Sequence, residues 1–203
     1  MRDPRDDSAK HMDGDLPNDP FKDATPMPDP NAPPNALGDG IGASLDAALL
    51  TAKRRKDGTE KAFPVPWADY ATALGGGLWP GLHMLVGGTG SGKTTFALQC
   101  ALEGARAGHP VAYIGLELDA SQVAMRLAGE LAGVSWSKLW LGKSTDSEAE
   151  RFKEAADELR EMPIYPLSGG PSSWGASNIL TIAAQLSDKD TDGKPPLLVI
   201  DFH

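Results

Sequence analysis

The chain has 203 residues, of which 40% are hydrophobic and 23% are charged, and its net charge at pH 7 is −9. This length fits one α/β domain with a tail, and the acidic balance gives no support to nucleic-acid binding through bulk charge. No apolar run is long enough for a membrane helix, and acidic residues stand where a signal peptide would be basic, so we expect a cytoplasmic protein.

The first 40 residues hold eight prolines, nine aspartates and one aromatic residue, Phe21. Such a composition cannot bury enough apolar surface to offset chain ordering, so residues 1–43 are predicted to be a disordered acidic tail. A short amphipathic helix is predicted over residues 44–56, followed by a linker to residue 66. Its basic end, residues 53–56, is typical either of a solvated helix terminus or of a DNA-binding patch.

The most informative motif is the sequence GGTGSGKT at residues 87–94, which follows an apolar stretch predicted to be a strand over residues 83–86. Glycines let successive backbone N–H groups turn toward an anion, and the following helix points the positive end of its dipole at the same place. Lysine adds a full positive charge. The predicted nucleotide-binding residues are Gly87, Gly88, Thr89, Gly90, Ser91, Gly92, Lys93, Thr94 and Thr95.

Strands and helices alternate after this loop, which predicts an α/β fold with a mostly parallel sheet covered by helices on both faces. A helix over residues 93–107 contains Cys100, the only cysteine, which we expect in the core; a single cysteine excludes a disulfide framework and a zinc cluster. An apolar strand is predicted over residues 111–116, and Asp119 with Gln122 forms the pattern of a capping box for a helix to residue 132.

The last predicted elements are a helix over residues 146–162, a strand over 164–167, a helix over 173–186 and an apolar strand over 197–200 that ends in Asp201. Ligands of open α/β sheets bind at the carboxyl edge of the strands. Asp201 is therefore a candidate ligand of Mg²⁺, together with the Thr94 hydroxyl. The alternative is that Asp201 only caps the end of its strand.

Glu117 follows the strand over residues 111–116 and should emerge beside the phosphates. A carboxylate there can orient and deprotonate an attacking water, which makes Glu117 and Lys93 the candidate catalytic residues. Asp119 is a second candidate for the same role. Either acid can instead be an ordinary surface residue of the turn, with Asp119 capping the next helix.

These residues resemble the RecA-type ATPases, and among them the C-terminal motor domain of DnaB-like replicative helicases. The likeness spans about residues 67–202 and rests on GGGLWPGLHMLVGGTGSGKTTF, on VAYIGLELDASQVAMRL, on PIYPLSGGPSSWGASNIL and on LLVIDF. In that family a Leu-Glu pair carries the catalytic glutamate and an Arg-Leu pair follows. Leu116, Glu117, Arg126 and Leu127 stand at the matching positions; Arg126 can alternatively pair with Glu130 one helical turn later.

The resemblance implies a homo-oligomeric ring that binds ATP and Mg²⁺ and couples ATP hydrolysis to translocation along single-stranded DNA. The helix over residues 44–56 would then correspond to the family's linker helix, although an acidic tail replaces the family's helical N-terminal domain. The sequence ends at His203, before the DNA loops, sensor residue and arginine finger of the family. We therefore expect an incomplete RecA-type core with weak nucleotide binding and negligible turnover.

Two other function classes fit the same motifs. A regulatory or recombination ATPase resembling KaiC or RadA would use its nucleotide state to control oligomer assembly. A small-molecule kinase would use the same glycine loop, but the sequence carries no acceptor-binding motif. The sequence after His203 would discriminate between these classes, because basic loops and a late arginine favour the motor.

Overall fold

A computed structural model describes residues 40–169, 173–189 and 194–202 of the chain. Its internal contacts divide the chain into two units, residues 1–46 and 47–203. The described residues of the first unit are the beginning of helix α1, Gly40–Asp57, whose last turn carries Arg54, Arg55 and Lys56. This confirms the helix that we predicted over residues 44–56. Most of the predicted disordered tail lies outside the described residues.

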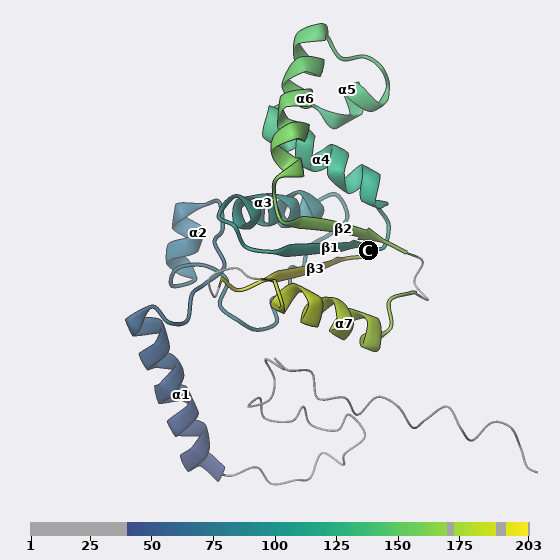
Figure 1. The fold of residues 1–203 in the computed structure, drawn as a ribbon. Coiled ribbons are helices and arrows are strands. Elements are labelled where there is room, and N and C mark those ends of the chain that lie inside the picture. The colour runs from purple at the N-terminus through teal and green to yellow at the C-terminus, as the bar shows by residue number, and fades with distance from the viewer. Residues whose placement is uncertain (1–39, 170–172, 190–193, 203) are drawn as a thin grey trace, which may run out of the picture. The chain divides into compact units, whose positions relative to one another are not determined.

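The second unit contains a three-stranded parallel sheet with the order β2-β1-β3 (Figure 1). The strands are β1 Val111–Gly115, β2 Ile164–Ser168 and β3 Leu197–Asp201. Every residue of the central strand β1 is buried, as expected for a parallel strand covered on both faces. The α/β class that we predicted is confirmed, and β3 has the predicted limits.

Helices cover both faces of the sheet (Figure 1). Helix α3, Lys93–Arg106, lies on one side of the strands and helix α7, Ala176–Ser187, on the other. Only residues 107–110 connect α3 to β1, with a left-handed turn at Gly108 (φ 82°), so the chain reverses at once. Helix α3 therefore runs antiparallel to β1, and its N-terminus points toward the carboxyl edge of the sheet.

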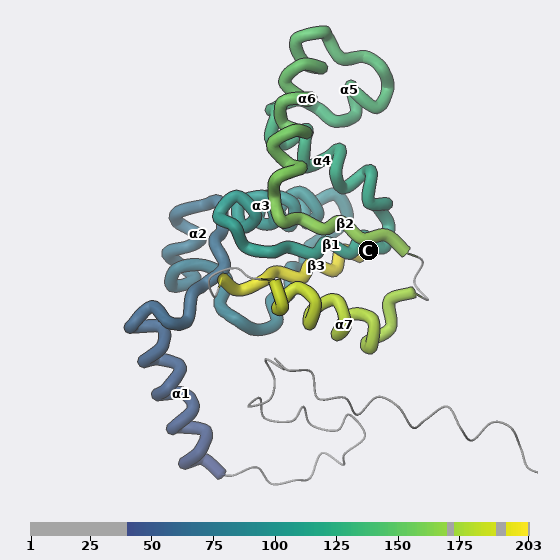
Figure 2. Tube along the Cα trace, viewed as in Figure 1, coloured from purple at the N-terminus to yellow at the C-terminus, as the bar shows by residue number. Residues whose placement is uncertain are grey.

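Three further helices form a group beside β2, as the Cα trace of Figure 2 shows. They are α4 Ala120–Ala132, α5 Trp136–Trp140 and α6 Asp146–Arg160. Helix α4 packs on α6 and on α3. The capping box predicted for Asp119 and Gln122 at the start of α4 is confirmed. Helix α5 and the short helix α2, Ala68–Ala73, were not predicted.

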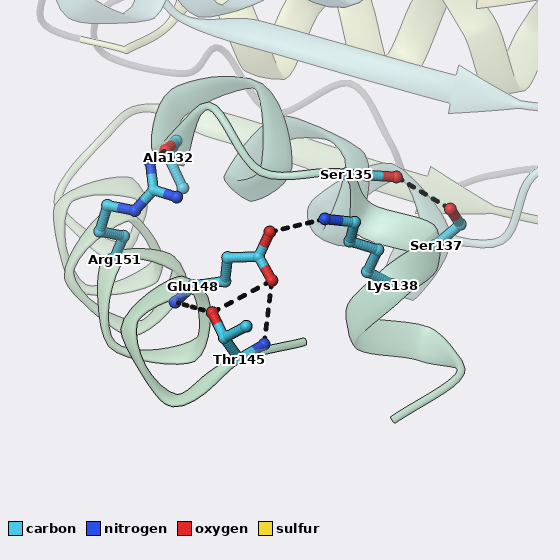
Figure 3. A network of polar contacts seen from close by, with 7 residues as sticks. All are labelled: Ala132, Ser135, Ser137, Lys138, Thr145, Glu148 and Arg151. Atoms are coloured by element: carbon cyan, nitrogen blue, oxygen red, sulfur yellow. Dashed lines mark hydrogen bonds and ion pairs between the residues drawn. The ribbon is translucent and has the colours of Figure 1, made fainter. Parts of the chain in front are cut away.

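Polar contacts fix the loop between α5 and α6 (Figure 3). The Glu148 carboxylate accepts a hydrogen bond from Lys138 Nζ at 2.7 Å and from the Thr145 backbone N–H at 2.9 Å, and the Glu148 N–H donates to Thr145 Oγ1 at 3.2 Å. These bonds form a second capping box, at the start of α6. An ion pair between α5 and α6 and the capping box at the start of α6 thus hold the two ends of this loop together.

The core lies between α3, α4 and the sheet. It combines buried side chains of these elements with one residue from the segment before α2: Phe63, Leu98, Ala101, Leu102, Ala105, Val111, Tyr113, Val123 and Leu127. Phe63 pairs with Leu78 in an antiparallel bridge and packs on Gly104, where a Cβ would lie only 1.8 Å from the ring. The packed part of the chain thus includes residues that we had assigned to the linker. Cys100 is a buried free cysteine, as predicted.

The strand predicted over residues 83–86 is not formed, and this prediction was wrong. No described strand is hydrogen-bonded to this segment, and its apolar side chains are exposed, with Met84 79% and Val86 82% accessible. An extended segment becomes a strand only through a hydrogen-bonded neighbour, which sequence pattern alone does not reveal. The segment nevertheless leads directly into the glycine-rich loop.

Candidate functional site

The glycine-rich loop leads into helix α3 and leaves the start of that helix open. Gly90 (φ 73°) and Gly92 (φ 90°) adopt left-handed backbone conformations that favour glycine, and Gly92 is the N-cap residue of α3. No side chain caps the helix. The first-turn N–H groups of an α-helix have no acceptor within the helix, and they carry the positive end of its dipole. The start of α3 therefore offers backbone donors to an anion.

The Lys93 side chain folds back over this loop. Its Nζ donates hydrogen bonds to the carbonyl oxygens of Gly87 at 2.9 Å and Gly88 at 3.0 Å. The loop is drawn together further by a turn in which the Ser91 N–H donates to the Gly88 carbonyl. A Cβ on Gly87 would approach Ser91 Oγ to 2.6 Å, so a larger residue there would require the Ser91 side chain to turn away. A full positive charge thus lies within the loop.

Asp201 ends strand β3 at the carboxyl edge of the sheet. Its Oδ2 accepts a hydrogen bond of 2.7 Å from the hydroxyl of Tyr113 on β1, and its carbonyl accepts one from the Leu116 N–H. Burial and the neighbouring Asp201 carboxylate raise the pKa of the Tyr113 phenol well above its usual range, so the phenol is the donor of this bond. Tyr113 was not singled out in the sequence.

Glu117 and Asp119 follow strand β1 at the same edge but differ in their surroundings. Glu117 is exposed in the turn between β1 and α4. The Asp119 carboxylate is engaged by the start of α4, since its Oδ1 accepts hydrogen bonds from the Gln122 N–H at 2.8 Å and the Ser121 hydroxyl at 2.6 Å. These bonds lower the Asp119 pKa. The geometry of Asp119 is that of a helix cap.

The donor set at this edge suits a hard cation. Magnesium prefers oxygen ligands from one or two carboxylates and completes its shell with phosphate and water. Thr94 supplies a hydroxyl from the first turn of α3, and Tyr113 engages only one oxygen of the Asp201 carboxylate. Among the described residues no cluster of three or more His, Cys, Asp or Glu side chains is placed to hold a metal. The Thr94 hydroxyl and the Asp201 carboxylate therefore fit a Mg²⁺ ion whose remaining ligands would be phosphate and water oxygens.

A cleft of about 350 Å³ opens between α3, α4 and the turn that leads to α5. Thr95 and Leu98 line it from α3, and Arg126 and Trp136 line it from the other side. The Arg126 guanidinium lies 4.8 Å from the centre of the Trp136 ring, and its buried Nε has no hydrogen-bond partner. The cleft thus combines an aromatic face with an unused cationic donor.

The pairing of Arg126 with Glu130 that we had considered does not occur. Glu130 Oε1 instead accepts a hydrogen bond of 2.5 Å from Gln99 of α3, and no ion pair of Arg126 is found among the described residues. Arg126 turns away from solvent because it stacks on Trp136. One sequence signal for this contact is the arginine within a predicted helix and the tryptophan shortly after the end of that helix.

The loop, the helix that follows it and the carboxyl edge of the parallel sheet define a P-loop ATPase of the RecA type. A family model described as "DnaB-like helicase C terminal domain" matches residues 69–202, which is more than half of the chain. The chain therefore belongs to the family of DnaB-like helicase C-terminal domains.

The solved structures include a chain described as "ATPase Domain of G40P", which matches with a TM-score of 0.57 and 17% sequence identity. The match covers 78% of this chain and 57% of that chain, so this chain spans little more than half of its length. At this identity the likeness concerns the fold. The sequence matches none of the curated proteins. In the described part of the chain, no helix is both long and apolar enough to cross a membrane.

Proposed function

We propose that this chain binds MgATP in the loop of residues 87–95 and belongs to a motor that hydrolyses it. The observation that carries the proposal is the uncapped start of α3 at Gly92, with the Lys93 ammonium inside the preceding loop. Backbone donors, a helix dipole and a lysine charge converge there on the space that a triphosphate would occupy. Membership of the DnaB-like family supports the same assignment.

Three residues hold the phosphates and their cation in this proposal. Lys93 Nζ donates to the carbonyl oxygens of Gly87 and Gly88. With a nucleotide bound, it would donate to oxygens of the β- and γ-phosphates instead. The Thr94 hydroxyl and the Asp201 carboxylate hold Mg²⁺, which when bound neutralises charge on the phosphates. Because Lys93 has neutral acceptors before the nucleotide arrives, it moves to the phosphates without breaking an ion pair.

Glu117 orients and deprotonates the attacking water. It follows β1 at the sheet edge where Asp201 ends β3, two positions beyond the Gly115–Asp201 pair. An exposed carboxylate accepts a proton from water at that point, while Asp119 is occupied as a cap. Glu117 is therefore the catalytic base of this proposal.

The nucleoside lies in the cleft between α3 and α4. Thr95, in the first turn of α3, lines that cleft, so a nucleotide whose phosphates sit at the helix start extends into it. Trp136 and Arg126, which stack on each other, line the same cleft.

In the complete motor, hydrolysis drives translocation along single-stranded DNA within a homo-oligomeric ring. The family assignment supports this role, whereas the net charge of −9 does not. The second candidate is a regulator resembling KaiC or RadA, in which the nucleotide controls assembly. Two measurements separate these candidates. Light scattering should show a change of assembly state with a nonhydrolysable ATP analogue for a regulator. An ATPase assay should show turnover that rises with single-stranded DNA for a motor.

Calorimetric titration of the chain with a nonhydrolysable ATP analogue and Mg²⁺ tests the binding site. Lys93→Ala should lower the affinity at least about tenfold, because a charge-assisted hydrogen bond to phosphate contributes roughly 1.5–3 kcal/mol. Lys153→Ala is the matched control, since Lys153 is an exposed lysine of α6 with one loose ion pair of 3.8 Å to Glu150. Equal affinity of the Lys93→Ala variant and the unaltered chain would place the nucleotide elsewhere.

A further inference from the structure

The hydrogen bond between Tyr113 and Asp201 joins two neighbouring strands diagonally. In the parallel register Tyr113 lies opposite Val199, and Gly115 lies opposite Asp201. The Tyr113 hydroxyl reaches two residues along the next strand and donates to Asp201 Oδ2 at 2.7 Å. A diagonal neighbour at this spacing is within reach of an aromatic side chain on the same face of a sheet. The contact thus depends on the length of the tyrosine side chain.

Gly115 makes this diagonal contact possible. It is the residue directly opposite Asp201, and it lacks a side chain that would stand between the phenol and the carboxylate. A Cβ at Gly115 would lie 2.3 Å from the carbonyl oxygen of Leu118, so the turn after β1 excludes any larger residue there. The same turn that leads to Glu117 therefore keeps the space beside Asp201 open for Tyr113.

The Tyr113 ring is held rigidly. It is fully buried, with 0% of its surface exposed, and belongs to the core cluster that contains Leu98, Ala101 and Leu102 of α3. Its hydroxyl is therefore fixed on the face of the sheet that α3 covers, and α3 carries Thr94 in its first turn. A rigid donor on that face fixes the orientation of a carboxylate at the sheet edge.

We propose that Tyr113 is a positioning residue for the cation site: its hydroxyl holds Oδ2 of Asp201 and directs Oδ1 toward Mg²⁺ or a water bound to it. The inference rests on the proposed function, because it presupposes that Asp201 serves the metal of a bound nucleotide. Carboxylates that ligate metals are themselves hydrogen-bonded, and removing such an outer partner typically costs roughly 10–100-fold in metal affinity.

The test is the Mg²⁺ dependence of nucleotide binding, measured with a fluorescent nonhydrolysable ATP analogue at increasing MgCl₂ and in EDTA. Tyr113→Phe removes the hydroxyl and keeps the ring in the core. We expect the Mg²⁺ concentration at half-maximal binding to rise roughly tenfold, while binding in EDTA stays unchanged. Tyr165→Phe is the matched control: Tyr165 lies on β2, is 38% exposed and has its ring beneath Lys189. The control should behave as the unaltered chain.

Asp201→Asn distinguishes a failure of the proposed function from a failure of the inference about Tyr113. If the unaltered chain binds nucleotide without regard to Mg²⁺ or to Asp201, the proposed function and this inference both fail. If Asp201→Asn weakens the Mg²⁺ dependence and a folded Tyr113→Phe variant does not, the inference alone is overturned. In the Asp201→Asn background, Tyr113→Phe should have no further effect on Mg²⁺, whereas a merely structural loss would lower thermal stability in both backgrounds.

If Tyr113→Phe does not fold, the proposal can be tested without substituting Tyr113. The chain has three tyrosines, so fluorotyrosine labelling gives three fluorine signals, assigned with Tyr70→Phe and Tyr165→Phe. Adding Mg²⁺ to the nucleotide complex should shift the Tyr113 signal and leave the Tyr165 signal in place. A Tyr113 signal that does not respond to Mg²⁺ would contradict the proposal.

Discussion

Two kinds of helix start occur in this fold, and they differ in what satisfies their backbone donors. Helices α4 and α6 begin at Asp119 and Thr145, and each is closed by a complete capping box. Helix α3 begins at Gly92 without a side-chain cap. A cap residue stabilises a helix by about 1 kcal/mol. Helices α2, α5 and α7 also begin without a side-chain cap, so the glycine-rich loop and the Lys93 side chain folded over it, and not the missing cap alone, set the start of α3 apart.

Packing compensates α3 for the missing cap. Its inner face contributes Leu98, Ala101, Leu102 and Ala105 to the core. Burial of a leucine side chain alone is worth roughly 1.5–3 kcal/mol, which exceeds the contribution of a cap. The helix is therefore stabilised by its middle and C-terminal turns and does not depend on a cap at its start.

The largest expected effect comes from giving α3 the cap that it lacks. Gly92→Asp places an acceptor and a negative charge at the helix start, where the phosphates are proposed to bind. Two unit charges 4 Å apart interact by about 4 kcal/mol at an effective dielectric constant near 20, so affinity for the nucleotide should fall at least about a hundredfold. Titration calorimetry with the Mg²⁺ complex of a nonhydrolysable ATP analogue measures the change.

Gly92→Asn is the matched control for that substitution, because it introduces the same shape and the same strain at φ 90° without the charge. Its affinity should lie well above that of Gly92→Asp. Equal losses in the two variants would mean that backbone strain, and not charge at the helix start, accounts for the effect.

A smaller effect is expected at the closed start of α4. Asp119→Ala removes the acceptor for the Gln122 N–H and should lower the free energy of unfolding, whereas Asp119→Asn retains an acceptor and should lower it less. Denaturant unfolding followed by circular dichroism measures both. Nucleotide affinity should stay within about twofold of the unaltered chain; a larger loss in Asp119→Asn would give Asp119 a role in the site beyond capping.

The smallest effect concerns pH and the closed start of α6. The Lys138 ammonium, followed by the Thr145 N–H, lowers the pKa of Glu148 from 4.5 to about 2. A carboxylate that is more acidic in the folded state stabilises the fold above its unfolded pKa, and this contribution is lost as the pH falls from 4.5 toward 2.

Glu148→Gln should therefore lower the melting temperature near neutral pH, and its difference from the unaltered chain should shrink as the pH falls through that window. Thermal melts at several pH values between about 7 and 3 test this. Glu150→Gln, on the same helix with a looser ion pair, is the control. A difference that persists undiminished at the acidic end would show that the charge of Glu148 is not what stabilises the loop.

Much of this fold follows from local pattern. The start of α3, the capping box of α4 and the limits of β3 were all predicted, because glycine turns, caps and apolar runs act over a few residues. The segment over residues 83–86 shows where pattern fails. It has the composition of a strand, but a strand also needs a hydrogen-bonded neighbour, which lies elsewhere in the chain.

The site divides in the same way. The glycine-rich loop was predicted from spacing alone, and Glu117 and Asp201 were predicted from their positions after apolar runs; their roles stay predictions. Tyr113 was missed, because its contact with Asp201 depends on the register between β1 and β3 and on the absence of a side chain at Gly115. An i,i+4 pair with Glu130 was one alternative for Arg126, but Arg126 packs on Trp136 instead, a tertiary contact that the local pattern does not reveal.

Backbone amide exchange across the loop tests the central claim most directly. Hydrogen–deuterium exchange of the chain should be measured with and without the Mg²⁺ complex of a nonhydrolysable ATP analogue. If the open donors of α3 bind the triphosphate, amides of residues 88–95 become protected, while those at the starts of α4 and α6 keep their exchange rates. Saturating nucleotide that leaves residues 88–95 exchanging as before would contradict the account.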